Sequence, residues 1–150
     1  MKMLLNGEWV DRPQKLEVCN PQDGSLVDTV PLATIEDMEA AITAAVAAAA
    51  TARQIPVHRR MAVLEAAATT MEREHESFAR TIAREGIKTI REARKEVTRC
   101  IQTMRISAEE ARRLNGETIS FDQMPGSENR RGFYQREPVG VIGAVSYTHL

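Results

Sequence analysis

Histidines, cysteines and closely spaced carboxylates are the side chains of this sequence that could hold a metal ion or act as nucleophiles, acids or bases. The histidines and cysteines lie far apart along the chain and match no known spacing of metal ligands. They are His58, His75, His149, Cys19 and Cys100. We therefore expect no metal site and no catalytic residue among them.

The neighbourhoods of these residues favour structural roles. His75 falls on an apolar helical stripe, which indicates a packed or edge histidine. Cys100 lies on or beside another such stripe and is interpreted as an inert thiol, and Cys19 sits next to a turn with no base near it in sequence. Acidic pairs within helical segments, Glu72/Glu76 and Glu109/Glu110, are interpreted as solvated faces. Residues 140–143 match no phosphate-binding glycine motif.

Turn residues and alternating apolar residues predict short strands at the start of the chain. The strands are expected over 8–10, 16–19 and 26–30, with the last two joined as a hairpin by the turn at 20–24. Helical spacing then begins after Thr34, a good N-cap residue, and its many alanines predict a helix packed close to a neighbour.

Two further helices follow. From Val57 to Ile82, apolar residues recur every three or four positions, so they share one face of a helix. This spacing predicts one helix that begins near Pro56 and ends at Gly86. The sequence from Thr89 to Glu92 is a capping box, and the helix that it opens is expected to end at Asn115-Gly116.

The last part of the chain has strand character. Residues 132–137 are expected to form a strand before Pro138, after a polar loop over 124–129. Residues 139–145 carry no polar side chain, which is typical of a central strand of a parallel sheet covered by helices. A parallel partner needs a crossover of about a dozen residues or more, so we expect this strand to lack its partners here.

The composition excludes several classes of protein but does not identify a function. The 150 residues suit one domain, 43% of them are hydrophobic and 27% charged, and the formal charge is −1. Residues 51–115 hold fourteen basic and nine acidic side chains, interpreted as solvated helix faces. With 4% aromatic residues, the chain lacks a base-stacking platform, and we expect no nucleic-acid partner. Widely separated cysteines and the absence of a long apolar run predict a cytoplasmic protein without membrane contact.

The order of several motifs resembles the aldehyde dehydrogenase superfamily. The matching segments run from about residue 6 to residue 145 and are Asn6–Val10, Val18–Gly24, Asp37–Ile42, Ala108–Glu117 and Arg136–Ala144. Residues Glu85–Lys88 resemble the family's E-x-G-K pattern with one residue lost or shifted. The resemblance implies an α/β fold, present in its N-terminal part as short strands, three long helices, a hairpin and the first strand of a Rossmann-like sheet.

The resemblance also implies an activity. Family members oxidise an aldehyde to an acid or thioester with NAD or NADP, using a cysteine nucleophile that would lie beyond residue 150. Aligned without gaps, Val145 and Ser146 stand at positions that line the cofactor, while His149 stands in the slot of an oxyanion-binding asparagine whose role we do not transfer. We therefore divide the chain into 1–145 and a non-native or divergent tail, 146–150, and expect the chain alone to be inactive.

The hairpin before Pro138 resembles the family's oligomerisation strands, which implies a homo-oligomeric parent. The alternative is a stand-alone helical interaction protein that docks through its Arg-rich helices, with residues 139–145 paired to another chain.

Overall fold

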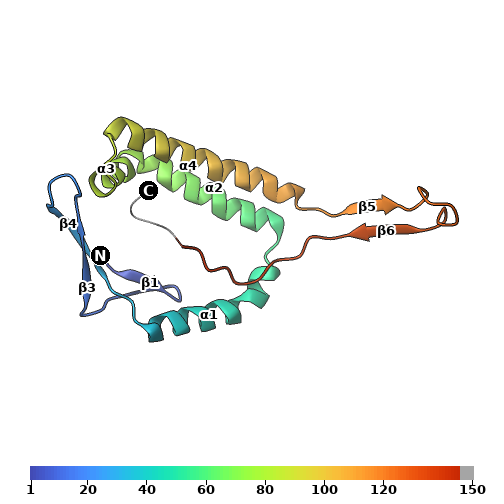
Figure 1. Cartoon of the computed structure of the whole chain (residues 1–150), viewed down its shortest axis with the longest axis horizontal. Coiled ribbons are helices and arrows are strands. Elements are labelled where there is room, and N and C mark those ends of the chain that lie inside the picture. Colours follow the sequence, from blue (N-terminus) through green and yellow to red (C-terminus); the bar gives the residue numbers. More distant parts are fainter. Residues whose placement is uncertain (146–150) are drawn as a thin grey trace.

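The computed structural model describes residues 1–145 as three two-stranded sheets and four α-helices arranged as an open frame with a projecting arm (Figure 1). The strands are β1 (Met3–Leu5), β2 (Glu8–Val10), β3 (Lys15–Cys19), β4 (Leu26–Pro31), β5 (Glu117–Ser120) and β6 (Arg131–Tyr134). The helices are α1 (Ile35–Arg53), α2 (Val57–Arg73), α3 (His75–Glu85) and α4 (Ile90–Glu110), the last continued by a 3₁₀ turn over Ala111–Arg113.

The N-terminal strands pair as two antiparallel hairpins, β1–β2 and β3–β4. Asn6 and Gly7 both adopt positive φ, 50° and 82°, in the tight turn of the first hairpin, a geometry that Asn-Gly readily supplies. In the second, the Asn20 amide donates to the Ser25 carbonyl at 2.8 Å and the Gly24 amide donates to the Asn20 carbonyl at 2.8 Å. The hairpin predicted across residues 20–24 is thereby confirmed.

Helix α1 begins at a capping box that also ties the helix to the preceding strands. Thr34 accepts from the Asp37 amide, and the Asp37 carboxylate accepts from the Thr34 amide at 3.0 Å. The same carboxylate binds the Arg12 guanidinium, with Arg12 Nε 3.0 Å from Asp37 Oδ2. Hydrogen bonds from Arg12 and Thr34 lower the pKa of Asp37, which is 6% exposed, to about 2. A charged Asp37 therefore links the β2–β3 loop to the first turn of α1.

The prediction of a single helix from Pro56 to Gly86 is wrong. The helical path breaks at Glu74, whose φ of −102° and ψ of 17° lie outside the α-helical region, and α3 turns away from α2 (Figure 1). The break lets α3 pack across α4, where Ala79 is completely buried. The apolar stripe continues across the break because both helices contact α4, so periodicity alone could not reveal it.

The core lies between α2, α3 and α4 and consists mainly of small side chains. Its buried members are Ala68, Ala79, Ala93, Val97 and Ile101, with Met71, Ile82 and Met104 packed against them. Helices α2 and α4 run antiparallel along each other (Figure 1), and alanines at the contact allow a close approach. This three-helix unit is the part of the chain that buries most of its apolar face.

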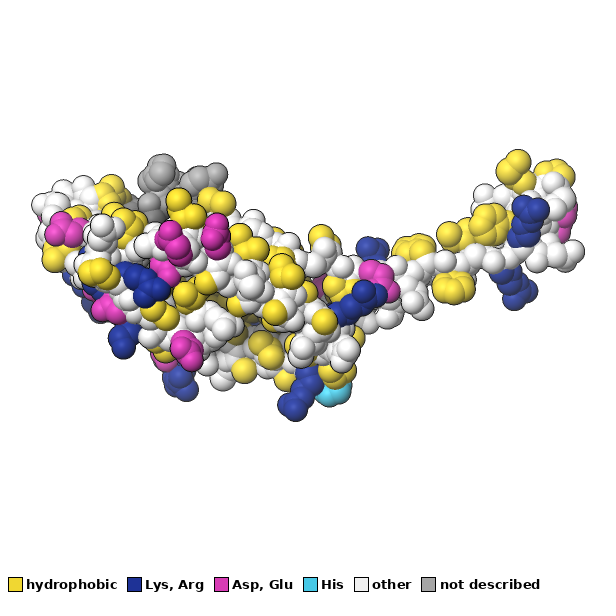
Figure 2. Space-filling model, turned by 90° about the horizontal axis from the view of Figure 1, so that it is seen from below, with side chains coloured by type: hydrophobic (Ala, Val, Ile, Leu, Met, Phe, Trp, Pro, Cys, Tyr) yellow, Lys and Arg dark blue, Asp and Glu magenta, His cyan; other side chains and the backbone are white. Residues whose placement is uncertain are grey.

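Helix α1 does not pack as its alanine content predicted. Met38, Ile42 and Val46 are exposed, and Asp37 is its one buried residue within the described structure. An apolar stripe is buried only where a second apolar surface packs against it. Helices α2, α3 and α4 pack their apolar stripes against one another, so they do not cover the stripe of α1. Figure 2 shows hydrophobic side chains spread over the face seen from below.

The loop between α3 and α4 holds an unusual backbone conformation. Ile87 adopts a φ of 51°, the left-handed region that glycine tolerates best, and its side chain is 64% exposed. The next residue, Lys88, forms an ion pair with Glu96 at 2.6 Å. The predicted capping box follows, since Thr89 accepts from the Glu92 amide and Glu92 accepts from the Thr89 amide.

Within residues 1–145, no helix is long and apolar enough to cross a membrane.

Candidate functional site

The apolar run over residues 139–145 was predicted to be a central strand, but in the described structure it forms no strand. Val139, Ile142 and Val145 are 91%, 74% and 81% exposed. A strand is stable only beside a hydrogen-bonded neighbour, and none of the six strands pairs with this run. The strand predicted over residues 139–145 is therefore not formed in the described structure.

The predicted cofactor contacts fall at the end of this run. Val145 is the one of the two that the structure describes, and its side chain is 81% exposed. Ser146 and His149, like the whole proposed tail 146–150, lie outside the described residues.

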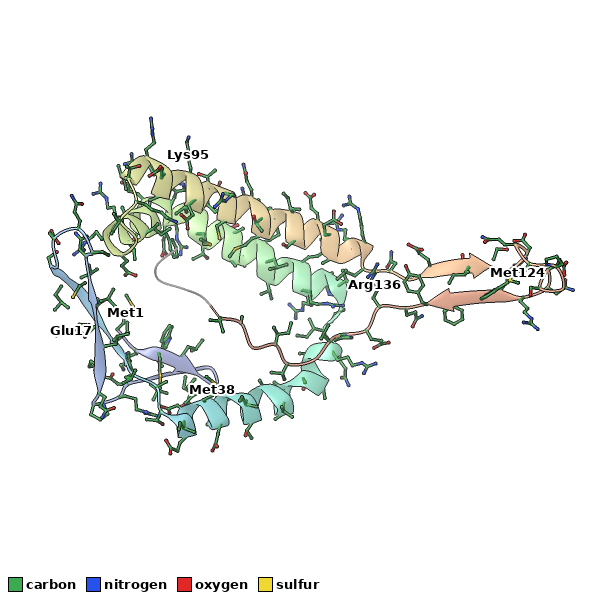
Figure 3. The ribbon with its side chains drawn as sticks, viewed as in Figure 1. Met1, Glu17, Met38, Lys95, Met124 and Arg136 are labelled. Atoms are coloured by element: carbon green, nitrogen blue, oxygen red, sulfur yellow. The ribbon has the colours of Figure 1, made fainter. Side chains whose placement is uncertain are left out.

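The arm is the most prominent feature near this run. Strands β5 and β6 pair antiparallel from Glu117↔Tyr134 to Ser120↔Arg131 and project away from the helices, as Figure 1 shows. Phe133 is 74% exposed, and Met124, at 69%, lies at the tip of the arm (Figure 3). The hairpin predicted before Pro138 is thus present, and it exposes apolar side chains over its length.

Glycine allows two close approaches within the arm. A Cβ on Gly116 would overlap the backbone carbonyl of Tyr134, and a Cβ on Gly132 would come within 2.7 Å of the Phe121 ring. The contact of Gly116 with Tyr134 lies at the base of the arm, where the two strands meet the helices, whereas the contact of Gly132 with Phe121 lies within the arm.

The carboxylates of the helices are held by arginines. Glu76 accepts from Arg94 at 2.8 and 2.9 Å, and Glu72 accepts from Arg105 at 2.7 Å. In each case the hydrogen bond from the arginine lowers the pKa of the glutamate. A carboxyl group that stays ionised cannot supply a proton near neutral pH, so these residues act as ion-pair partners across α2, α3 and α4.

The histidine and cysteine side chains are placed apart. The Nε2 of His75 lies 3.0 Å from the Thr98 hydroxyl, and because that hydroxyl donates to the Arg94 carbonyl, Nε2 is the donor to it. Cys100 is half-buried with its Sγ 3.9 Å from the Sδ of Met71, and Cys19 is exposed. Within residues 1–145, no three His, Cys, Asp or Glu side chains gather closely enough to hold a metal ion.

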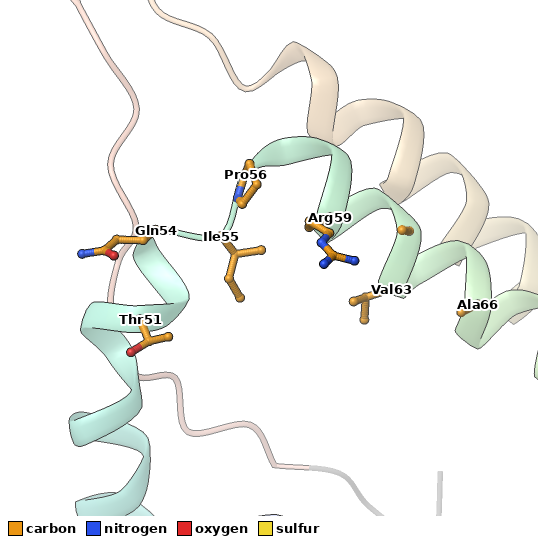
Figure 4. A pocket seen from close by; sticks show the side chains of 8 residues that line it. Thr51, Gln54, Ile55, Pro56, Arg59, Val63 and Ala66 are labelled. Carbon is orange, nitrogen blue, oxygen red and sulfur yellow. The ribbon is translucent and has the colours of Figure 1, made fainter.

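Two grooves include residues from the α1–α2 junction in their lining. One, of about 610 Å³, is lined mainly by apolar groups together with Arg59 (Figure 4). The other, of about 530 Å³, is lined by Arg53, Val57, Arg60, Leu114, Arg136, Glu137 and Pro138. Sequence reasoning missed the second groove, because its residues come from segments up to 85 positions apart, Arg53 to Pro138.

Comparison with known proteins places most of the chain in one family. Residues 9–146 match the family model described as the aldehyde dehydrogenase family. Over 131 residues, 87% of this chain and 28% of the relative, the sequence is 42% identical to aspartate-semialdehyde dehydrogenase 1 of Pseudomonas canavaninivorans. Over 144 residues, 96% of this chain and 30% of the relative, it is 38% identical to 3-sulfolactaldehyde dehydrogenase of Priestia megaterium.

A solved structure shows the same fold. The chain is similar to the NADP-dependent glyceraldehyde-3-phosphate dehydrogenase of Bacillus halodurans in complex with NADP, with a TM-score of 0.85 and 33% identity. The similarity covers 93% of this chain and 30% of that one. The chain thus spans less than a third of the length of the proteins that it matches.

Proposed function

The chain belongs to the aldehyde dehydrogenase family, and we propose from this membership that it is part of a longer protein that oxidises an aldehyde with NAD or NADP. The match over residues 9–146 carries the proposal. The relatives named above act, by their names, on chemically different aldehydes, so the proposal extends to an aldehyde and to no particular one.

The reaction needs groups that residues 1–145 do not bring together. Such a reaction would need a thiolate to attack the aldehyde carbon and water or another acceptor to release the acyl group, and NAD or NADP would supply the hydride acceptor. Cys100 is half-buried with its Sγ 3.9 Å from the Sδ of Met71, and within residues 1–145 neither Cys100 nor Cys19 has a hydrogen bond to a histidine or carboxylate that could activate its thiol. We propose that the nucleophile and its general base belong to the longer protein, and that this chain supplies helices and the arm.

The direct test is an assay of the purified 150-residue chain for aldehyde-dependent NADH or NADPH formation. We expect no turnover above buffer with a panel of aliphatic, acidic and aromatic aldehydes. A longer gene product that contains this sequence is expected to turn over at least one of them. Turnover by the 150 residues alone, or none by the longer protein with any aldehyde, would contradict the proposal.

For the longer protein we propose that Val145 and Ser146 contact the cofactor. The exposure of Val145 at the end of an apolar run leaves its side chain available to a ligand. Val145→Glu would place a negative charge where a nucleotide approaches. We expect it to raise the KM for NAD(P) about tenfold or more, with a smaller change in the KM for the aldehyde. Val139→Glu, on the same run, is the matched control.

We also propose that the arm contacts a second copy of the protein. Its strands have unpaired outer edges, and Phe133 and Met124 are exposed apolar side chains on it. Such edges and side chains are normally covered in a stable protein. Phe133→Arg in the longer protein is expected to lower the mass measured by light scattering toward that of a monomer, while Glu117→Arg, also on the arm but polar at the outset, is expected to have less effect.

A further inference from the structure

The groove that joins the base of the arm to the helices carries a concentration of positive charge. Arg53 comes from the end of α1, Arg60 from the first turns of α2 and Arg136 from the segment after β6. Figure 3 shows Arg136 where the arm meets the helices. Three arginines from separate segments thus line one groove of about 530 Å³.

Few carboxylates are available to pair with these arginines. Glu137 is the one acidic residue of the lining, and it is already paired with Arg53. Among residues 1–145, no carboxylate lies within ion-pair distance of Arg60 or Arg136. By contrast, Arg94 and Arg105 of α4 each form an ion pair with a glutamate. Arg60 and Arg136 therefore line the groove without a carboxylate of the described chain paired to them.

The chemistry of the lining selects a kind of ligand. Planar guanidinium groups bind phosphate oxygens through paired, charge-assisted hydrogen bonds. Val57, Leu114 and Pro138 form the apolar part of the same lining, against which a short carbon body could pack. We propose that this groove binds the phosphate group of a small molecule, either a phosphate ester or free phosphate. This inference goes beyond the proposed oxidation and does not depend on it.

The test is a calorimetric titration of the 150-residue chain, at low ionic strength, with glycerol 3-phosphate and with inorganic phosphate. Binding of either probe is expected, and tighter binding of the ester would identify an ester as the ligand, whereas equal affinities would identify free phosphate. Arg60→Gln and Arg136→Gln are each expected to weaken binding about five- to tenfold, since each removes one charged donor. Glu137→Gln is expected to tighten it about twofold or more by releasing Arg53.

The matched control is Arg59→Gln, which removes the same charge from the adjacent residue of α2 but lines the other groove (Figure 4). We expect it to change affinity less than twofold. Circular dichroism checks that each variant keeps its helices, and Glu137→Gln, which should gain affinity, keeps the test decisive where an arginine variant unfolds. Absence of binding, an equal loss with Arg59→Gln, or weaker binding with Glu137→Gln would overturn the proposal.

Discussion

Replacing Ile87 by glycine should stabilise the helical unit. Ile87 holds a φ of 51° in the loop before α4. A left-handed conformation costs a residue with a Cβ about 1–2 kcal/mol, and isoleucine is branched at that atom. Glycine avoids this cost but loses about 0.5–1 kcal/mol of backbone entropy on folding. With the Ile87 side chain 64% exposed, little burial is lost, and the net gain from Ile87→Gly is about 0.5–1 kcal/mol.

The family's E-x-G-K pattern also indicates a glycine at position 87. In E-x-G-K, the third residue is glycine, and in Glu85–Lys88 that third residue is Ile87. Gly86, one residue earlier, has an ordinary φ of −111°. The glycine of this chain, Gly86, therefore lies one residue before the position whose left-handed backbone favours glycine. Isoleucine occupies that position instead, and its backbone is strained as a result.

Hydrogen exchange of the α4 amides measures the effect without assuming that the whole chain unfolds in one step. Strain in the loop is released when the start of α4 opens, so removing it should make opening rarer. A gain of about 0.5–1 kcal/mol corresponds to about two- to fivefold slower exchange of protected amides such as those of Ala93 and Val97.

Ile87→Ala is the control, because alanine keeps the Cβ and therefore most of the strain while removing the rest of the side chain. The reasoning would be refuted if Ile87→Gly exchanged as fast as the parent sequence or faster. It would also be refuted if Ile87→Ala slowed exchange as much as glycine does, since the gain would then come from loss of the side chain.

Three further predictions address packing, the arm and pH. Val97→Ala, at a fully buried position, should destabilise the helical unit by about 2 kcal/mol, seen as faster exchange of α4 amides. Gly116→Ala should force the arm away from the Tyr134 carbonyl, and nuclear magnetic resonance should show shifts in β5 and β6 but not in the core. Because the pKa of Asp37 is lowered from 3.8 to about 2, its pairing with Arg12 stabilises the fold above pH 3.8 and is lost as the pH falls toward 2. Asp37→Asn should remove that part of the acid dependence of unfolding, and an unchanged profile would contradict it.

Local signals in the sequence determined many element boundaries. The turn at 20–24 and the capping residues Thr34 and Thr89 act through hydrogen bonds to neighbours within a few positions, and the structure confirms all three. The hairpin before Pro138 and the family membership also followed from the order of short motifs. These features depend on residues close together in the chain, so the sequence displays them directly.

Tertiary contacts decided the remaining features. The break at Glu74 carries no proline or glycine signal and exists because α3 packs across α4. The pair of Arg12 with Asp37 joins residues 25 positions apart, and the groove of Arg53, Arg60 and Arg136 joins three separate segments. Residues 139–145 have the composition of a central strand, but a strand forms only when neighbours supply its hydrogen bonds. The composition of a segment limits which secondary structures it can form, and the neighbouring elements that pack or pair with it determine which of these it forms.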